Sequence, residues 1–234
     1  VNNTSTSATA VTVNNGVTLT ATTLDNDAGT AAINGTLNAA AENASGATMN
    51  VAATGIVNGL ATNEGALNSL GSLAGGLTNL VAGAADLQGG SVTGDVNNSG
   101  TATLLVSGDT SVSGDVNNTS TSATAVTVNA GTILTVTSLD NYAGTAAING
   151  TLNGNAVNAS GGTLDVASTG VVTGIVTNDG TLETAGALQS GLTNQGTGSA
   201  DLEGGSVTGD VDNTGTATLL VSGNTSVTGD VNNT

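Results

Sequence analysis

The chain has 234 residues, of which 17 are acidic and none is Lys, Arg or His, so its formal charge is −17. Without cationic side chains it cannot neutralise nucleic-acid phosphates or anionic lipid, and we expect no nucleic-acid partner. Without His or Cys it has no disulfide, no Cys or His nucleophile and none of the usual zinc ligands. We therefore expect no enzyme activity, no catalytic residue and no cofactor, with calcium left open because carboxylates suit it.

The apolar residues are mostly small and aliphatic. They make up 37% of the chain, Tyr142 is the single aromatic residue, Pro is absent and Gly fills 36 positions. High net charge with few aromatics is typical of disordered chains, whereas Val, Leu and Ile favour strands. Order is expected if these residues recur in register. No apolar run is long enough to cross a bilayer, so we expect no membrane insertion.

A long internal repeat divides the chain. The segment that opens at Val1 recurs at Val116, and 81 of 115 aligned positions are identical without a gap. Such self-similarity is the sequence signature of a repeat architecture. We expect one unit of six coils over residues 1–115, a second of six coils over 116–230, and the start of a third unit at 231–234.

Asparagines mark a shorter repeat inside each unit. Each sub-repeat begins with an apolar residue, any residue and Asn, and the spacings 23, 17, 20, 16, 19 and 20 occur twice in succession. The mean spacing is about 19 residues, which is the length of a single solenoid coil. The asparagines are Asn3, Asn26, Asn43, Asn63, Asn79, Asn98, Asn118, Asn141, Asn158, Asn178, Asn194, Asn213 and Asn233.

Between successive asparagines the apolar residues alternate. In residues 101–106 the sequence reads Thr-Ala-Thr-Leu-Leu-Val, which places every second residue on one face of a strand. Counted from the Asn, apolar residues fall near positions +6, +8 and +13, for example Met49, Val51 and Ile56. Gly, Asn, Ser and Asp lie between these strands, where they tolerate left-handed corners. The abundant Gly, Thr, Asn and Val disfavour helix throughout.

Short alternating strands at this period predict an all-β fold, a single-stranded parallel β-helix (β-solenoid) with about 19 residues per coil and no helical domain. About 12 coils stacked at about 4.8 Å would form a rod about 58 Å long. A narrow lumen suits aliphatic side chains and would be overpacked by Trp. Proline would remove a hydrogen bond between coils, so the absence of proline agrees with a backbone that is paired to the coils on both sides. We expect the asparagines to form an amide ladder along the stack.

The apolar-x-Asn-x-Gly-Thr pattern, as in residues 211–223, resembles the repeats of filamentous-haemagglutinin-type adhesins and autotransporter passenger domains. The resemblance covers the whole chain and implies a right-handed β-helix that is exported to the bacterial cell surface. It also implies a stalk, adhesin or filament role, with host or biofilm glycans bound by a tip outside this chain. The regular repeat and the lack of cations and aromatics favour a scaffold over a ligand-binding tip.

Four aspartates are candidate calcium ligands. Asp95 and Asp115 each follow Gly in consecutive coils, and Asp210 and Asp230 repeat the arrangement. In-register carboxylates would lie about 5 Å apart, and they would either repel or recruit a cation. The alternative interpretation is that each Asp is a solvated corner residue bonded to its own backbone.

Two further patterns have structural alternatives. Thr-x-Thr pairs could bind ice, but ordinary strand threonines also explain them because the pairs do not recur on every coil; they are Thr18/Thr20/Thr22, Thr101/Thr103 and Thr216/Thr218. Glu183, Asp201 and Glu203 could form a glycosidase-like carboxylate pair, but two of the three are not repeated in the first unit and no aromatic platform accompanies them.

The leading hypothesis is a structural rod of an extracellular bacterial adhesin or surface filament, whose partner is itself through array continuation or end-to-end stacking. The alternative is a module that binds glycan, calcium or ice on a lateral face of a secreted β-solenoid.

Overall fold

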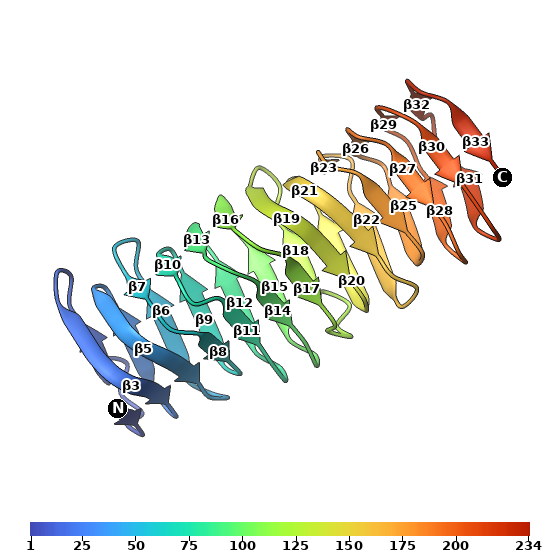
Figure 1. Cartoon of the computed structure of the whole chain (residues 1–234). Helices are drawn as coiled ribbons and strands as arrows, with labels where there is room; N and C mark the ends of the chain where they lie inside the picture. The colour runs from blue at the N-terminus through green and yellow to red at the C-terminus, as the bar shows by residue number, and fades with distance from the viewer.

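Alternating apolar residues and glycine corners wind the chain into an elongated stack. The computed structural model describes all residues, 1–234, and contains 33 strands and no helix. It accordingly has no helix that could cross a membrane. The coils follow one another along a single axis from the N-terminus to the C-terminus (Figure 1). The predicted all-β parallel β-solenoid is confirmed.

One face of the rod is a sheet of 12 strands, one from each coil. These strands are β2 (Val11–Val13), β4 (Thr30–Ile33), β6 (Thr48–Val51), β9 (Ala66–Ser69), β12 (Ala84–Leu87), β15 (Thr103–Val106), β18 (Val126–Val128), β20 (Gly144–Ile148), β22 (Gly162–Val166), β25 (Thr181–Thr184), β28 (Ser199–Leu202) and β31 (Thr218–Val221). We call this face the 12-strand face. Its strand count agrees with the predicted number of coils.

The other 21 strands form a second sheet that covers two faces. Strands that end at the ladder asparagines are β1 (Asn2–Asn3), β3 (Thr18–Asn26), β5 (Thr36–Asn43), β8 (Ala61–Asn63), β11 (Leu77–Asn79), β14 (Val96–Asn98), β17 (Val116–Asn118), β19 (Ile133–Asn141), β21 (Thr151–Asn158), β24 (Val176–Asn178), β27 (Leu192–Asn194), β30 (Val211–Asn213) and β33 (Val231–Asn233). The short strands are β7 (Ile56–Val57), β10 (Ser72–Leu73), β13 (Gly90–Val92), β16 (Thr110–Val112), β23 (Val171–Val172), β26 (Ala187–Leu188), β29 (Ser206–Val207) and β32 (Ser226–Val227).

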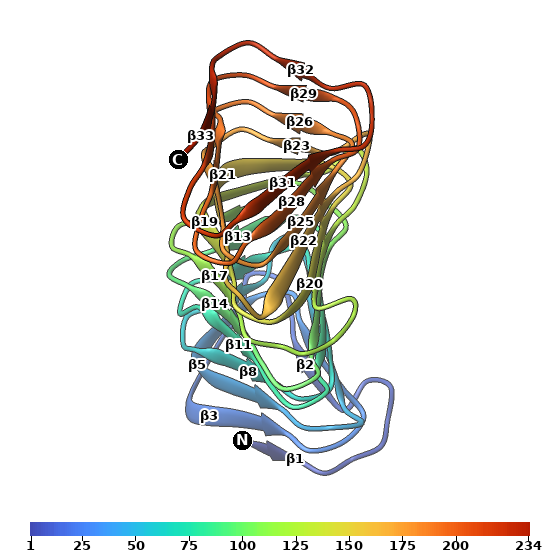
Figure 2. The ribbon, with the colours of Figure 1, turned by 90° about the vertical axis from the view of Figure 1, so that its right-hand side faces the viewer.

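Every strand pairing is parallel and joins neighbouring coils. Figure 2 shows this stacking for β23, β26, β29 and β32, which lie side by side in coil order. The long strands β3, β5, β19 and β21 belong to both faces of the larger sheet, and register shifts interrupt the β3–β5 and β19–β21 pairs. Each coil therefore has three sides.

Pairing continues across the boundary between the two sequence repeats. β14 pairs with β17, and β15 pairs with β18, although the repeat boundary lies between residues 115 and 116. The two sequence units thus share one hydrogen-bonded stack. One hydrophobic cluster of 42 buried residues fills it from Val13 to Val211.

The core is built from columns of stacked side chains. On the 12-strand face one inward column reads Ala31, Met49, Leu67, Ala85 and Leu104 along successive coils. Small and large aliphatic residues share the column, so neighbouring coils interdigitate without aromatic bulk. A second inward column contains two polar residues, Ser69 and Thr184, and the buried hydroxyl of Thr184 has no hydrogen-bond partner.

One detail of the predicted core is wrong. Ile56 was expected to face inward at position +13 from its asparagine, but it is 37% exposed and the next residue, Val57, is fully buried. In a coil of 19 residues the inward position is +13, as at Val92, whereas a coil of 20 residues has one extra corner residue and moves it to +14. The strand period of two then turns Ile56 outward.

The backbone holds a single non-glycine residue at positive φ. Val81 has a φ of 56°, and the second repeat has Gly196 at the equivalent turn with a φ of 59°. A β-branched side chain in the left-handed region costs about 1–2 kcal/mol. The strain at Val81 is therefore a local feature of the first unit.

We predict that Val81→Gly stabilises the protein by roughly 1 kcal/mol, because it relieves the strain of the left-handed backbone conformation and removes only an exposed side chain. The control is Val81→Ala, which removes the same methyl groups but keeps the Cβ. Chemical denaturation measures both. Equal stability of the two variants would show that φ strain at this turn is unimportant.

Candidate functional site

A continuous ladder of asparagine side chains runs the length of the rod. At each step the Nδ2 of one asparagine donates to the Oδ1 of the asparagine in the next coil, over 2.6–2.9 Å, from Asn3 through to Asn233. The predicted ladder is confirmed at all thirteen positions. Every member from Asn3 to Asn213 is buried, and only Asn233 in the last coil is exposed.

The second amide proton of the ladder asparagines is also hydrogen-bonded. From Asn3 to Asn194 the same Nδ2 donates to a backbone carbonyl of the next coil, for example from Asn98 to Ala125 at 2.9 Å. The backbone carbonyls at this corner are thus satisfied by side chains. Because each amide donates only toward the C-terminal side, the ladder has a direction.

The candidate calcium aspartates lie where the sequence placed them, in pairs on consecutive coils. Asp95 Oδ1 accepts the backbone N–H of Asp115 at 3.0 Å, and Asp210 Oδ1 accepts that of Asp230 at 2.9 Å. The Gly before each second Asp has a steric reason, since a Cβ at Gly114 would collide with the Asp95 carboxylate. Each first aspartate thus accepts a hydrogen bond from the backbone of the next coil, whereas the alternative interpretation expected a bond to its own backbone.

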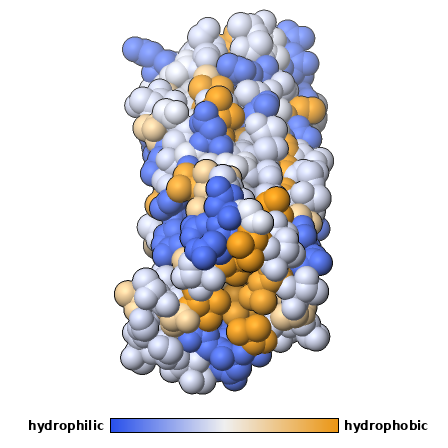
Figure 3. Space-filling view, turned by 90° about the vertical axis from the view of Figure 1, so that its left-hand side faces the viewer, coloured by the Kyte–Doolittle hydropathy of each residue, from blue (hydrophilic) through white to orange (hydrophobic).

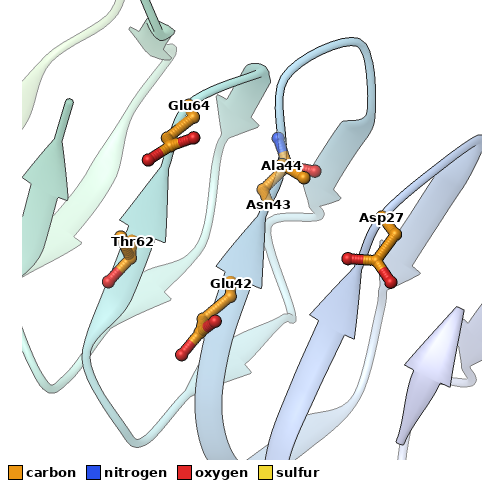
Figure 4. Close-up of a pocket in the computed structure, with 6 residues that line it drawn as sticks. All are labelled: Asp27, Glu42, Asn43, Ala44, Thr62 and Glu64. Atoms are coloured by element: carbon orange, nitrogen blue, oxygen red, sulfur yellow. The ribbon is translucent and has the colours of Figure 1, made fainter. Parts of the chain in front are cut away.

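Carboxylates come together at two further places, and the sequence analysis had named only Glu183 and Asp201 of the second. In the first unit Asp27, Glu42 and Glu64 border a shallow depression of about 140 Å³ together with Thr62 (Figure 4). The second unit has Tyr142, Val157 and Asp179 at the equivalent positions, so the depression is not a feature of the repeat. No group of three or more acidic side chains is close enough to hold a metal ion.

The second place is on the 12-strand face of the second unit. Asp165, Glu183 and Asp201 occupy one outward column in direct register. Hydroxyl residues form the neighbouring column on the same strands: Thr145, Thr163, Thr181, Ser199 and Thr218. Glu203 lies beyond the end of β28, outside the acidic column. The distance from the preceding ladder asparagine does not mark the acidic column, because it is 7 residues for Asp165, 5 for Glu183 and 7 for Asp201.

The first unit has amides at the positions of two of these acids, whereas Asp86 is the equivalent of Asp201. Asn50 and Asn68 stand at the positions of Asp165 and Glu183, and Asn68 Nδ2 donates to Asn50 Oδ1 at 2.9 Å. The Thr-x-Thr pairs considered for ice do not share one face, because Thr18 and Thr20 belong to β3 and Thr103 belongs to β15. Lateral chemistry thus differs between the units, while the interior ladder does not.

The fold and its ladder define the chain as a parallel β-solenoid. No family model matches the sequence, and no curated protein matches it either.

Replacing one ladder residue tests how much the ladder contributes. We predict that Asn98→Asp destabilises the rod by more than about 3 kcal/mol, because an isosteric carboxylate cannot donate and would face the oxygens of Asn118 and Ala125. The matched control is Asn97→Asp on the adjacent outward position, which we expect to change stability by less than about 1 kcal/mol. Denaturant unfolding distinguishes them, and similar losses would argue against a special role for the ladder.

Calcium at the aspartate corners remains a prediction with a direct test. If the four aspartates hold calcium, a calcium concentration 100-fold above Kd raises the free energy of unfolding by about 2.7 kcal/mol relative to the same protein in the presence of a chelator. The double variant Asp95→Asn/Asp210→Asn keeps an oxygen acceptor for the next coil but removes charge, so it should lose that gain. A thermal midpoint that is the same in calcium and chelator would remove the calcium site.

Proposed function

We propose that the chain is a structural rod or stalk segment of an extracellular bacterial adhesin or surface filament. The observation that carries the proposal is the uninterrupted ladder, in which each buried asparagine from Asn3 to Asn213 joins its coil to the next. Nearest-neighbour stacking lets such a rod grow by whole repeats without a new core. The function is mechanical, with no catalytic step.

The surface supports a scaffold that stays dispersed. All 17 carboxylates have the same sign, and there is no Lys or Arg to pair between neighbouring rods. Like-charged rods repel at their sides, which favours solubility over lateral clumping. The absence of Lys and Arg also removes every trypsin site, which suits an exposed location. Glycans of a host or biofilm would then be bound by a tip beyond this segment.

A lateral binding module is the second candidate. It is favoured by the hydroxyl and carboxylate columns of the second unit, where Thr163, Thr181 and Ser199 each lie two residues before an acid on the same strand. Calcium or the hydroxyls of a glycan would suit these oxygens. This candidate is local to the second unit and is compatible with a rod.

Length and location test the rod. We predict that adding a third copy of residues 116–230 lengthens the particle by about 29 Å at constant width, because six coils are added at about 4.8 Å each. Small-angle scattering or electron microscopy measures this. Antibodies against the segment should label intact cells of the source bacterium, with a cytoplasmic protein as the negative control. A globular particle would contradict the rod, and labelling only after lysis would contradict the surface location.

A further inference from the structure

Five asparagines of the chain are followed directly by glycine, and they are Asn15, Asn34, Asn58, Asn149 and Asn153. In such a pair the backbone nitrogen of the glycine can reach the side-chain carbonyl carbon of the asparagine, because glycine has no Cβ to obstruct the approach. Hydrophilic side chains are spread over the face of the rod that Figure 3 shows, so exposure alone does not single out one of these asparagines. The hydrogen bonding and the packing of each glycine do distinguish them.

Four of the five pairs are held closed by the stack of coils. The N–H groups of Gly35, Gly59 and Gly150 each donate at 3.0–3.1 Å to a backbone carbonyl of the preceding coil. The fourth glycine, Gly154, lies within β21. A Cβ at any of these four glycines would collide with a carbonyl oxygen of the preceding coil, so their backbone has no room to rearrange without local opening of the stack.

The pair at Asn15 lies in a turn that stands clear of the stack. The turn is closed by the N–H of Val17, which donates to the carbonyl of Asn14 at 3.0 Å. Gly16 has a φ of 75°, its N–H donates to no backbone carbonyl, and a Cβ there would meet nothing within 4 Å. Asn15 and Gly16 are both exposed. The backbone nitrogen of Gly16 is therefore free to move toward the side chain of Asn15.

The second unit shows that this openness belongs to the turn and not to its place in the chain. Gly131 occupies the equivalent position in the middle of the rod, with coils on both sides, since β19 pairs with β16 and with β21. Its φ is 78°, its N–H again donates to no backbone carbonyl, and a Cβ there would again meet nothing within 4 Å. The residue before it is Ala130, so the second unit has the open turn without the reactive amide.

We propose that Asn15 is a modification site at which the chain deamidates itself, with water as the only co-reactant. The backbone nitrogen of Gly16 attacks Cγ of Asn15 and loses its proton, while the Nδ2 group takes up a proton and leaves as ammonia. The product of this step is a five-membered succinimide ring. Water then opens the ring. Cleavage of the new N–Cγ bond gives aspartate, and cleavage of the original peptide bond between residues 15 and 16 gives isoaspartate.

Each reacted chain gains one negative charge and keeps its fold. The turn is exposed, and a Cβ at Gly16 would meet nothing, so the ring and the lengthened backbone of isoaspartate have room. A rod that stays in place for a long time would thus come to differ in charge from a newly made one. The inference goes beyond the proposed rod function and rests on the fold alone, so a location other than the cell surface would leave it unaffected.

Peptide mapping of the aged protein tests the proposal. The folded chain is incubated at mildly alkaline pH, which favours loss of the amide proton, and is digested at intervals with a glutamate-specific protease, since trypsin has no site. Tandem mass spectrometry then follows each asparagine. We expect Asn15 to be converted more than about tenfold faster than the four closed asparagines, because only these need local opening. In concentrated urea all five should react at similar rates, since every pair is then open.

Exchanging the residues of the two open turns tests the cause. Asn15→Ala copies the second unit and should abolish the fast conversion, whereas Ala130→Asn copies the first unit and should add a site that reacts at a rate similar to that of Asn15. An introduced asparagine that stays unreacted in Ala130→Asn would contradict the role of the turn. Conversion of Asn15 no faster than that of the four closed asparagines in the folded chain would overturn the proposal.

Far-ultraviolet circular dichroism before and after ageing checks the fold. We expect an unchanged β signal, and its loss in step with the conversion of Asn15 would contradict a product that the turn accommodates. If a variant fails to fold, the comparison of the five asparagines within the unaltered chain still decides.

Discussion

The structure depends on one constraint, which is that each coil finds its hydrogen-bond partners only in the coils on either side of it. All strand pairing is parallel and lies between successive coils, so each residue keeps the same position around the coil and the same direction as its counterpart one coil away. Buried asparagines fit this arrangement because a primary amide both donates and accepts along the axis. The same stacking gives the core its columns of aliphatic side chains.

That constraint explains the unusual composition. Proline would delete a ladder hydrogen bond, and a large aromatic side chain would not fit among the stacked aliphatic residues. Glycine is needed where coils approach closely, as at Gly114 and Gly229, where a Cβ would collide with the carboxylate of Asp95 or Asp210. The corner sequence Gly-Asp-Val therefore lets neighbouring coils pack closely, and it also presents one pair of carboxylates per unit at the surface.

Charge is confined to the outside, and its pattern is only partly repeated between the two units. With no cationic side chain to pair with, several acidic groups accept hydrogen bonds from hydroxyls, amides and backbone N–H groups instead, as when Ser222 donates to Asp201 at 2.7 Å. The first unit gathers acids around Glu42, whereas the second gathers them around Glu183. Near-identical interiors with different surfaces indicate that the interior alone is needed for the fold, and that the outward positions are free to vary.

Sequence by itself determined the coil period, the parallel stacking and the asparagine ladder, because these follow from the spacing of Asn and from the alternation of small aliphatic residues. It did not determine which of Ile56 and Val57 faces the core, since one additional corner residue reverses the inward and outward positions of the strand that follows. Nor did it show that Asp165, Glu183 and Asp201 form a single column. Those residues are 18 positions apart in sequence, and only the register between neighbouring coils brings them together. Local patterns specify what a coil is, whereas the lateral chemistry depends on how the coils align, and that alignment exists only in the folded stack.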